Sequence, residues 1–228
     1  MNKTIKYSCI FFLIITNFQI FAQTKMKHFN CKSSMHFGDI EICLPEIDGM
    51  KECYKNPIAK NILNTSNPSN NPIFGYYLTD TDYSQIGNIE NLSFDEYFTI
   101  FALEKMKNVE INYKDLNTIY ELMEKGYIKE NWSELKIKFQ KSTNYLSFGK
   151  PVLIESYSLN NKLKTFVLLS KIQNGVEEQI QIQILNFIQI KKRLLSLSYY
   201  LDYNGEKSFK IAKSKNDYIT ALFLEENN

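Results

Sequence analysis

The stretch that decides the fold is 151–205, PVLIESYSLNNKLKTFVLLSKIQNGVEEQIQIQILNFIQIKKRLLSLSYYLDYNG. From Ile180 to Ile184 every second residue is isoleucine and the residues between are glutamines. This period of two is typical of a strand with one buried and one polar face. Apolar runs on either side are separated by turn residues, and Asn174-Gly175 is among the strongest short-range hairpin signals. The stretch therefore predicts a four-strand antiparallel meander.

The segment after this stretch predicts a closing helix. Ser214 stands three residues before Asp217, a spacing that suits a helix cap. Tyr218, Leu222 and Leu224 then recur at helical spacing. We expect this C-terminal helix to cover one face of the sheet.

The segment before it predicts three central helices. Ser93-Phe94-Asp95-Glu96 has the form of a capping box, and aromatic residues follow at helical spacing, so a helix is expected to about Lys107. A second helix is expected over 113–126, and a third after the cap at Asn131-Trp132-Ser133-Glu134. Helices grouped before hairpin-linked strands indicate an α+β domain with a mainly antiparallel sheet.

The N-terminal part predicts strands separated by a loop. Alternation over 35–44 predicts one half-buried strand, which Pro45 ends. Three prolines among asparagines over 56–72 predict an exposed loop, and 73–79 predicts a short strand. No internal repeat divides the chain, so a single globular domain is expected over 23–228.

This order of elements resembles the PsbP-like fold. The only local stretch of sequence that supports the resemblance stands before the last helix and is Lys192-Arg193-Leu194-Leu195-Ser196-Leu197. The chain departs from that family by inserting three helices where the family often has fewer. The resemblance implies architecture alone and carries no functional residue to this chain.

The first 22 residues predict a secretory signal peptide. Lys3 and Lys6 precede a mostly apolar stretch over 7–20, and Ala22 supplies a small residue at the expected cleavage point. The apolar run is too short and too interrupted to cross a bilayer, so no stable membrane anchor is expected after cleavage. The end Ile20-Phe21-Ala22-Gln23 resembles the signal ends of bacterial exports. A periplasmic or secreted protein is therefore expected.

Cleavage would leave three cysteines in a compartment where disulfides persist. If Asp48-Gly49 is a two-residue hairpin turn, the side chains of Cys43 and Cys53 point to opposite sides. This geometry favours a bridge between Cys31 and Cys53 and leaves one spare thiol. The spacing lacks the close pairs of a zinc site, so no metal site is expected.

Composition and motifs nominate neither a catalytic residue nor a cofactor. Lysine and arginine number 27 against 25 aspartate and glutamate, a net charge of +2 that provides no basis for nucleic-acid binding. His28 and His36 are the only histidines, and neither a His-Glu-x-x-His motif nor a serine elbow occurs. No glycine-rich phosphate loop is present.

Aromatic residues on expected strands are the best binding candidates, because rings on an open sheet face can stack a sugar or anchor a protein. The candidates are Tyr76, Tyr77, Tyr200 and, at a helix start, Trp132. The alternative for each is ordinary core packing. Tyr200 is out of phase with Tyr199 and Tyr203, which makes it the better surface candidate.

The first functional hypothesis is an exported, non-catalytic binding module that holds a protein partner or small ligand in the cell envelope. The alternatives are a carboxylate-dependent envelope hydrolase and a structural accessory protein. A pocket with two carboxylates and a raised pKa is typical of the enzyme, and an exposed aromatic patch is typical of the binding module.

Overall fold

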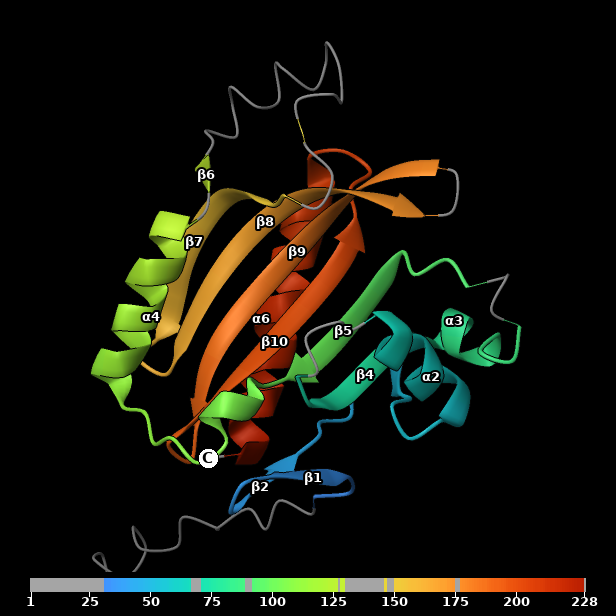
Figure 1. Cartoon of the computed structure of the whole chain (residues 1–228). Coiled ribbons are helices and arrows are strands. Elements are labelled where there is room, and N and C mark those ends of the chain that lie inside the picture. Colours follow the sequence, from blue (N-terminus) through green and yellow to red (C-terminus); the bar gives the residue numbers. More distant parts are fainter. Residues whose placement is uncertain are drawn as a thin grey trace, which may run out of the picture. The chain divides into compact units, whose positions relative to one another are not determined.

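The alternating residues of the C-terminal half form long paired strands in the computed structural model of the chain (Figure 1). The structure describes residues 31–66, 71–88, 92–126, 128–129, 146, 150–174 and 177–227. The elements, in chain order, are β1 (Ser34–Phe37), β2 (Ile40–Cys43), β3 (Met50–Glu52), α2 (Pro57–Ser66), β4 (Ile73–Thr79), α3 (Asp80–Ser84), β5 (Glu96–Phe101), the 3₁₀ helix η2 (Glu104–Met106), α4 (Tyr113–Gly126), β6 (Ile128–Lys129), β7 (Val152–Asn160), β8 (Leu163–Asn174), β9 (Glu177–Ile190), β10 (Arg193–Asp202) and α6 (Lys207–Asn227).

One eight-stranded sheet, in the order β3-β4-β5-β10-β9-β8-β7-β6, organises residues 31–228. β7, β8 and β9 each pair antiparallel with the next strand along the chain. β10 then pairs antiparallel with β5, and β5 with β4. Among the described strands, β6 and β7 form the one parallel pair. The α+β class with a mainly antiparallel sheet is therefore confirmed.

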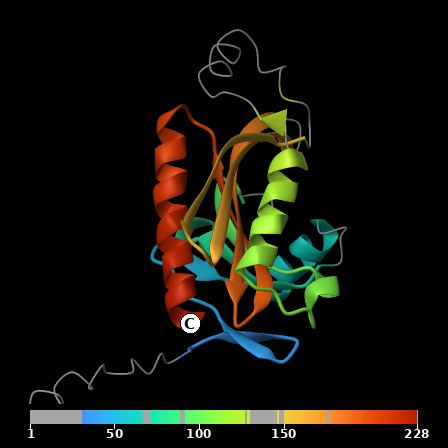
Figure 2. The ribbon, with the colours of Figure 1, turned by 90° about the vertical axis from the view of Figure 1, so that its left-hand side faces the viewer.

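Helices cover both faces of the sheet, because α6 and α4 pack on opposite sides of it (Figure 2). On the α6 side, Phe223 is fully buried in the main core cluster with Ile184 and Leu197. On the other side, Leu116 of α4 belongs to a second cluster that includes Phe166. Burying each such side chain stabilises the fold by about 2 kcal/mol. The predicted C-terminal helix is confirmed, although it begins at Lys207 and not near Ser214.

A polar network lies within the apolar layer between α6 and the sheet. The Thr165 hydroxyl donates to Asn186 Oδ1 at 2.8 Å, and Asn186 Nδ2 donates to Asn216 Oδ1 at 2.7 Å. Asn186 Nδ2 also donates to the carbonyl of Leu197 at 3.2 Å. Thr165, Asn186 and Asn216 have no exposed surface. The network therefore ties β8, β9 and β10 to α6 at one position along the helix.

The first expected central helix is wrong, because 96–101 forms strand β5 in the middle of the sheet. The Ser93 hydroxyl does not cap a helix but donates to Asp82 Oδ1 at 3.2 Å. Phe94 adopts a positive φ of 53°, which breaks helical geometry immediately before the strand. The second expected helix is confirmed as α4, and the third lies outside the described residues.

Two N-terminal predictions also need correction. The expected single strand over 35–44 is a hairpin of β1 and β2, which reverses at Gly38 with a φ of 64°. The expected loop over 56–72 contains the helix α2 over Pro57–Ser66, which Pro57 can begin because a first-turn residue needs no N–H donor. The short strand over 73–79 is confirmed as β4.

None of the helices that the structure describes is long and apolar enough to span a bilayer. The predicted signal peptide, residues 1–22, lies outside the described part of the chain.

Candidate functional site

Tyrosines from three neighbouring strands form a row on the side of the sheet that also carries α4. Tyr200 of β10 stands directly opposite Tyr97 of β5, and their rings stack with centroids 4.3 Å apart and an interplanar angle of 12°. The Tyr76 ring of β4 lies 5.8 Å from that of Tyr97. Figure 1 shows β9, β10 and β5 in view between α4 and α2. The tertiary fold therefore builds a continuous aromatic row from separate parts of the sequence.

Glutamines of β9 continue this row and fix the tyrosine hydroxyl groups. Gln183 Nε2 donates to the Tyr200 hydroxyl at 2.9 Å and lies 3.4 Å from Ser198 Oγ. The Tyr97 hydroxyl donates to Gln181 Oε1 at 3.5 Å, a long contact. Tyr97, Gln183 and Tyr200 are partly exposed. We call Tyr76, Tyr97, Tyr200, Gln181 and Gln183 the tyrosine face.

Burial keeps the phenols of the tyrosine face neutral. It raises the pKa of Tyr97 well above the usual value of 10.0, and the neighbouring Tyr200 and Tyr76 add to the effect. Burial likewise raises the pKa of Tyr76. The face therefore offers aromatic carbon and neutral hydrogen-bonding groups, which suit recognition better than nucleophilic attack.

Asp202 adds a carboxylate at one end of the tyrosine face. It follows Tyr200 by two residues on β10 and pairs in register with Gln181. Partial burial, and then the Asp95 carboxylate beside it, raise the pKa of Asp202 from 3.8 to about 6. Its Oδ1 atom is buried and accepts no hydrogen bond from any described residue. A carboxylate in this condition is more typical of a functional site than of a structural one.

Replacing Asp202 with asparagine is expected to stabilise the protein at neutral pH. The pKa of Asp202 is higher in the folded state than in the unfolded chain, so its stabilising effect is fully present below about pH 4 and is lost as the pH rises through about 6. Asparagine does not ionise, so the Asp202→Asn variant does not lose this stability as the pH rises. We expect a gain of about 1 kcal/mol above pH 7 and no gain below pH 4, after allowing for partial exposure.

Urea unfolding midpoints measured at both pH values test this expectation. Asp48→Asn, at the exposed turn before β3, is the matched control and is expected to shift neither midpoint. A lower midpoint for Asp202→Asn at neutral pH contradicts the interpretation, because it means that the charged carboxylate stabilises the fold.

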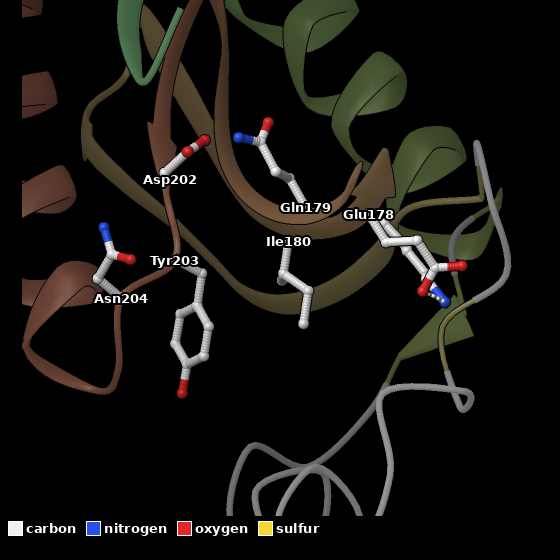
Figure 3. A pocket seen from close by; sticks show the side chains of 7 residues that line it. Glu178, Gln179, Ile180, Asp202, Tyr203 and Asn204 are labelled. Atoms are coloured by element: carbon white, nitrogen blue, oxygen red, sulfur yellow. Dashed lines mark ion pairs between the residues drawn. The ribbon is translucent and has the colours of Figure 1, made fainter. Parts of the chain in front are cut away.

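A notch of about 340 Å³ adjoins the tyrosine face at Asp202 (Figure 3). Its lining comes from the ends of β8, β9 and β10 and consists of Lys171, Glu178, Gln179, Ile180, Asp202, Tyr203 and Asn204. Lys171 Nζ pairs with Glu178 Oε2 at 2.6 Å, and the Lys171 side chain is only 4% exposed. We call this cavity the notch.

The expected binding residues are placed differently by the structure. Tyr76 and Tyr200 both lie on the side of the tyrosine face, joined through Tyr97, but Tyr76 is buried at 4% exposed and only Tyr200 is partly exposed. Tyr77 points to the opposite face, where it is 1% exposed and its hydroxyl donates to the Pro45 carbonyl at 3.0 Å. Tyr77 is therefore a core residue. Trp132 lies outside the described residues.

Sequence reasoning missed Tyr97, Gln181, Gln183 and Asp202 as site residues. Tyr97 was expected on a helix, so its partnership with Tyr200 was not foreseeable. The alternation of glutamine with isoleucine over 179–184 did reveal a polar sheet face. That alternation does not show which strands pair with β9 on either side.

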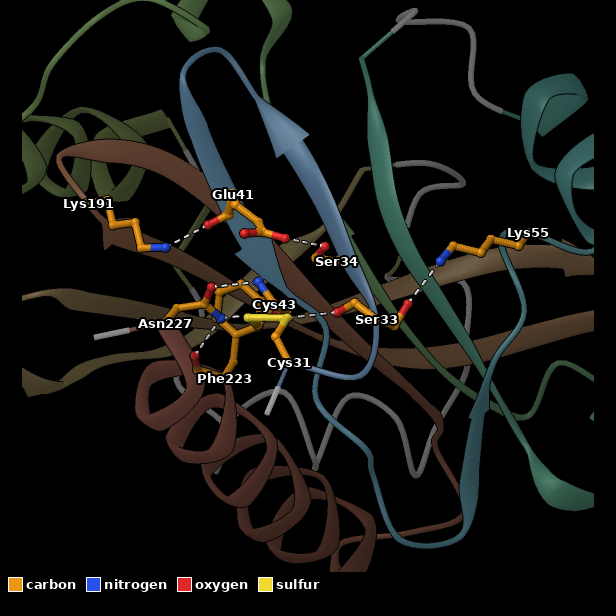
Figure 4. The surroundings of a disulfide bond; sticks show 9 residues. All are labelled: Cys31, Ser33, Ser34, Glu41, Cys43, Lys55, Lys191, Phe223 and Asn227. Atoms are coloured by element: carbon orange, nitrogen blue, oxygen red, sulfur yellow. Dashed lines mark hydrogen bonds between the residues drawn. A yellow bond between two sulfur atoms is a disulfide. The ribbon is translucent and has the colours of Figure 1, made fainter. Parts of the chain in front are cut away.

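The disulfide joins Cys31 and Cys43, whose Cα atoms are 5.5 Å apart, and the expected partner of Cys31 is thereby corrected (Figure 4). Asp48 and Gly49 do form a turn, but β2 pairs with β1 and β3 pairs with β4. Ser34 stands opposite Cys43 in the first of these pairs, which brings Cys31 near it. The premise of a hairpin around Gly49 was therefore wrong.

Cys53 is the spare thiol. It is 2% exposed, and its Sγ donates to the Tyr76 carbonyl at 3.1 Å. Burial, followed by the charge of Glu52, raises the pKa of Cys53 to about 12. The thiol therefore stays protonated at neutral pH, and it stabilises the packing beneath Tyr76. Within the described ranges, no three His, Cys, Asp or Glu side chains gather in a way that could hold a metal ion.

In comparisons with known proteins, no protein-family model, no curated protein and no solved structure matches this chain. The PsbP-like resemblance therefore stays a prediction.

Proposed function

We propose that the chain is an exported, non-catalytic binding protein of the periplasm or cell exterior, whose tyrosine face holds a protein partner or a small ligand. The observation that carries this proposal is the convergence of three tyrosine rings and two glutamine amides from four strands on one sheet face, where Tyr97, Tyr200 and Gln183 are partly exposed and Tyr76 and Gln181 are buried beside them. Tyrosine is enriched in binding hot spots because its ring buries apolar area while its hydroxyl forms hydrogen bonds.

Preorganisation of the side chains supports a role in recognition. Tyr200 is held by the ring of Tyr97 on one side and by the amide of Gln183 at its hydroxyl. Side chains that are already ordered lose little conformational entropy when a ligand binds. A sheet also supports such groups more rigidly than a loop does.

The location is supported by two features of the N-terminal part. The Cys31–Cys43 disulfide fits an oxidising compartment, since such bonds are rare in the cytosol. The sequence of residues 1–22 predicts a leader that directs the chain there. An immunity or inhibitor protein of the envelope fits this combination of export and partner binding.

A carboxylate-dependent hydrolase is the second candidate, and one observation favours it. Partial burial and then the neighbouring Asp95 carboxylate raise the pKa of Asp202 to about 6, and a carboxyl group with a raised pKa is typical of a general acid. Asp202→Asn separates the candidates, because it is expected to abolish turnover by a hydrolase but not to abolish capture by the tyrosine face, where Tyr97 and Tyr200 are unchanged.

Site-specific photocrosslinking tests the binding proposal. A photoreactive phenylalanine at Tyr200 of the mature chain, expressed in its native envelope, is expected to give one saturable adduct. The matched control is the same probe at Tyr218 of α6, which is 47% exposed on the other side of the sheet and is expected to give none.

Competition makes this experiment specific. Excess unlabelled wild-type chain is expected to suppress the Tyr200 adduct, whereas a chain carrying Tyr97→Ala and Tyr200→Ala is expected to compete at least tenfold less well, because hot-spot truncations cost more than about 2 kcal/mol. Equal labelling from both probe positions, or equal competition by both chains, contradicts the proposal.

A further inference from the structure

We propose that the notch binds a primary ammonium or guanidinium group, with Asp202 as its main acceptor and the methylene chain of the ligand beside Gln179. The inference deepens the proposed function and rests on it, since it names the chemistry of a ligand at the border of the tyrosine face.

The notch exists because β9 continues beyond the end of β10. Asp202, the last residue of β10, pairs with Gln181, whereas β9 begins at Glu177. One further hydrogen bond, from the Tyr203 N–H to the Ile180 carbonyl at 2.8 Å, precedes the turn at Gly205 into α6. The edge of β9 over 178–180 therefore faces a cavity of about 340 Å³ instead of a strand.

The charges that line the notch favour a cation. Lys171 and Glu178 neutralise each other through their 2.6 Å ion pair. Asp202 then remains, with Asp95 adjoining it, and neither forms an ion pair with a described lysine or arginine. A carboxylate that is partly buried without a counter-charge attracts a cation that can replace the lost hydration.

Asp202 receives a side-chain hydrogen bond from Gln181, which leaves part of its carboxyl group unsatisfied. Its buried Oδ1 atom accepts no hydrogen bond from the described residues, and leaving such an atom unsatisfied costs about 1–3 kcal/mol. Because Oδ1 itself is buried, an N–H group of a ligand binds the exposed part of the carboxyl group and stabilises its charged form. Charge-assisted hydrogen bonds of this kind are about twice as strong as neutral ones.

The methylene groups of Gln179, beside Asp202, suit a short aliphatic chain that carries the charge. Figure 3 shows the side chains of Asp202 and Gln179 directed toward each other on one side of β9, while Ile180 and Tyr203 point to the other side. The Tyr203 ring is held by Phe209 at 5.6 Å. A lysine or arginine side chain of a partner and a free organic amine both present this chemistry.

Titration of the full mature chain with n-butylammonium and with L-argininamide, followed by ¹H–¹⁵N NMR, tests the inference. We expect saturable shifts of the backbone amides of Gln179, Gln181 and Asn204, and at least tenfold weaker binding to Asp202→Asn. Asp48→Asn is the matched control and is expected to bind as the wild type does. Because Asp202→Asn is expected to be more stable than the wild type at neutral pH, lost binding cannot be ascribed to unfolding.

Three outcomes overturn the inference: equal binding of uncharged n-butanol, equal binding to Asp202→Asn, or shifts caused by Ca²⁺ alone.

If the cation belongs to a partner, excess butylammonium suppresses the Tyr200 crosslink; if it belongs to a free amine, the crosslink persists. A crosslink at Tyr200 with no amine binding refutes only the proposed cation site in the notch. Amine binding with no crosslink refutes the proposed tyrosine face alone.

Discussion

Replacing Asn186 with leucine is expected to lower the free energy of unfolding by about 4 kcal/mol, the largest effect of any single substitution considered. The leucine removes the acceptor of the Thr165 hydroxyl and the donor to Asn216. Both partners are fully buried, so water cannot replace the lost hydrogen bonds. Urea unfolding followed by far-ultraviolet circular dichroism measures the change.

Thr220→Val is the matched control for this prediction. Thr220 is also fully buried on α6, but its hydroxyl donates only to carbonyl groups of its own helix, at Asn216 and Asp217. We expect this control to cost less than about 1 kcal/mol. A double variant, Asn186→Leu with Asn216→Leu, is expected to lose less than the sum of the two single variants, because neither leaves the other unsatisfied. Additive losses contradict the network interpretation.

Removing the disulfide through Cys31→Ser and Cys43→Ser is expected to cost about 3 kcal/mol. The bond closes a loop with a sequence separation of 12, and breaking it returns conformational entropy to the unfolded chain. The variant is expected to remain folded, because Asn227 still binds Cys43's backbone: Asn227 Oδ1 accepts from the N–H at 2.8 Å, and Nδ2 donates to the carbonyl at 3.0 Å. Thermal and urea unfolding measure the loss.

The reductant dithiothreitol provides the control for this second prediction. It is expected to destabilise the wild type by the same amount and to leave the double serine variant unchanged, since the remaining thiol of Cys53 is already reduced. Equal stability of the oxidised and reduced wild type refutes the predicted contribution of the bond.

The strands β7 to β10 were predictable because each is governed by a local pattern. Apolar and polar residues alternate within one strand, and turn residues mark its ends, so a window of about ten residues contains the signal. The same is true of α4, where the apolar residues recur at helical spacing over 113–126. In these segments the local preference and the tertiary structure agree.

The central strand β5 was not predictable in this way. Phe94, Tyr97, Phe98 and Phe101 satisfy helical spacing, yet Phe98 and Ile100 point into the core on one face of the sheet, and Tyr97 belongs to the other. Pairing with β4 and β10 on both sides satisfies the backbone of β5 and overrides its local preference. β4 ends at Thr79 and β10 begins at Arg193, so both partners lie outside a window of about ten residues around β5.

The same distinction between local patterns and tertiary contacts applies to the candidate site. The sequence by itself determined the strands of the C-terminal half, the class of fold, the polar face marked by Gln181 and Gln183, and the surface phase of Tyr200, because each depends on residues close in the chain. Only the tertiary structure decided that Tyr97 stacks on Tyr200, that Cys31 bonds Cys43, and that Asp202 lies at a notch. Strand order and register set these contacts, because they decide which segments beyond a single strand lie side by side.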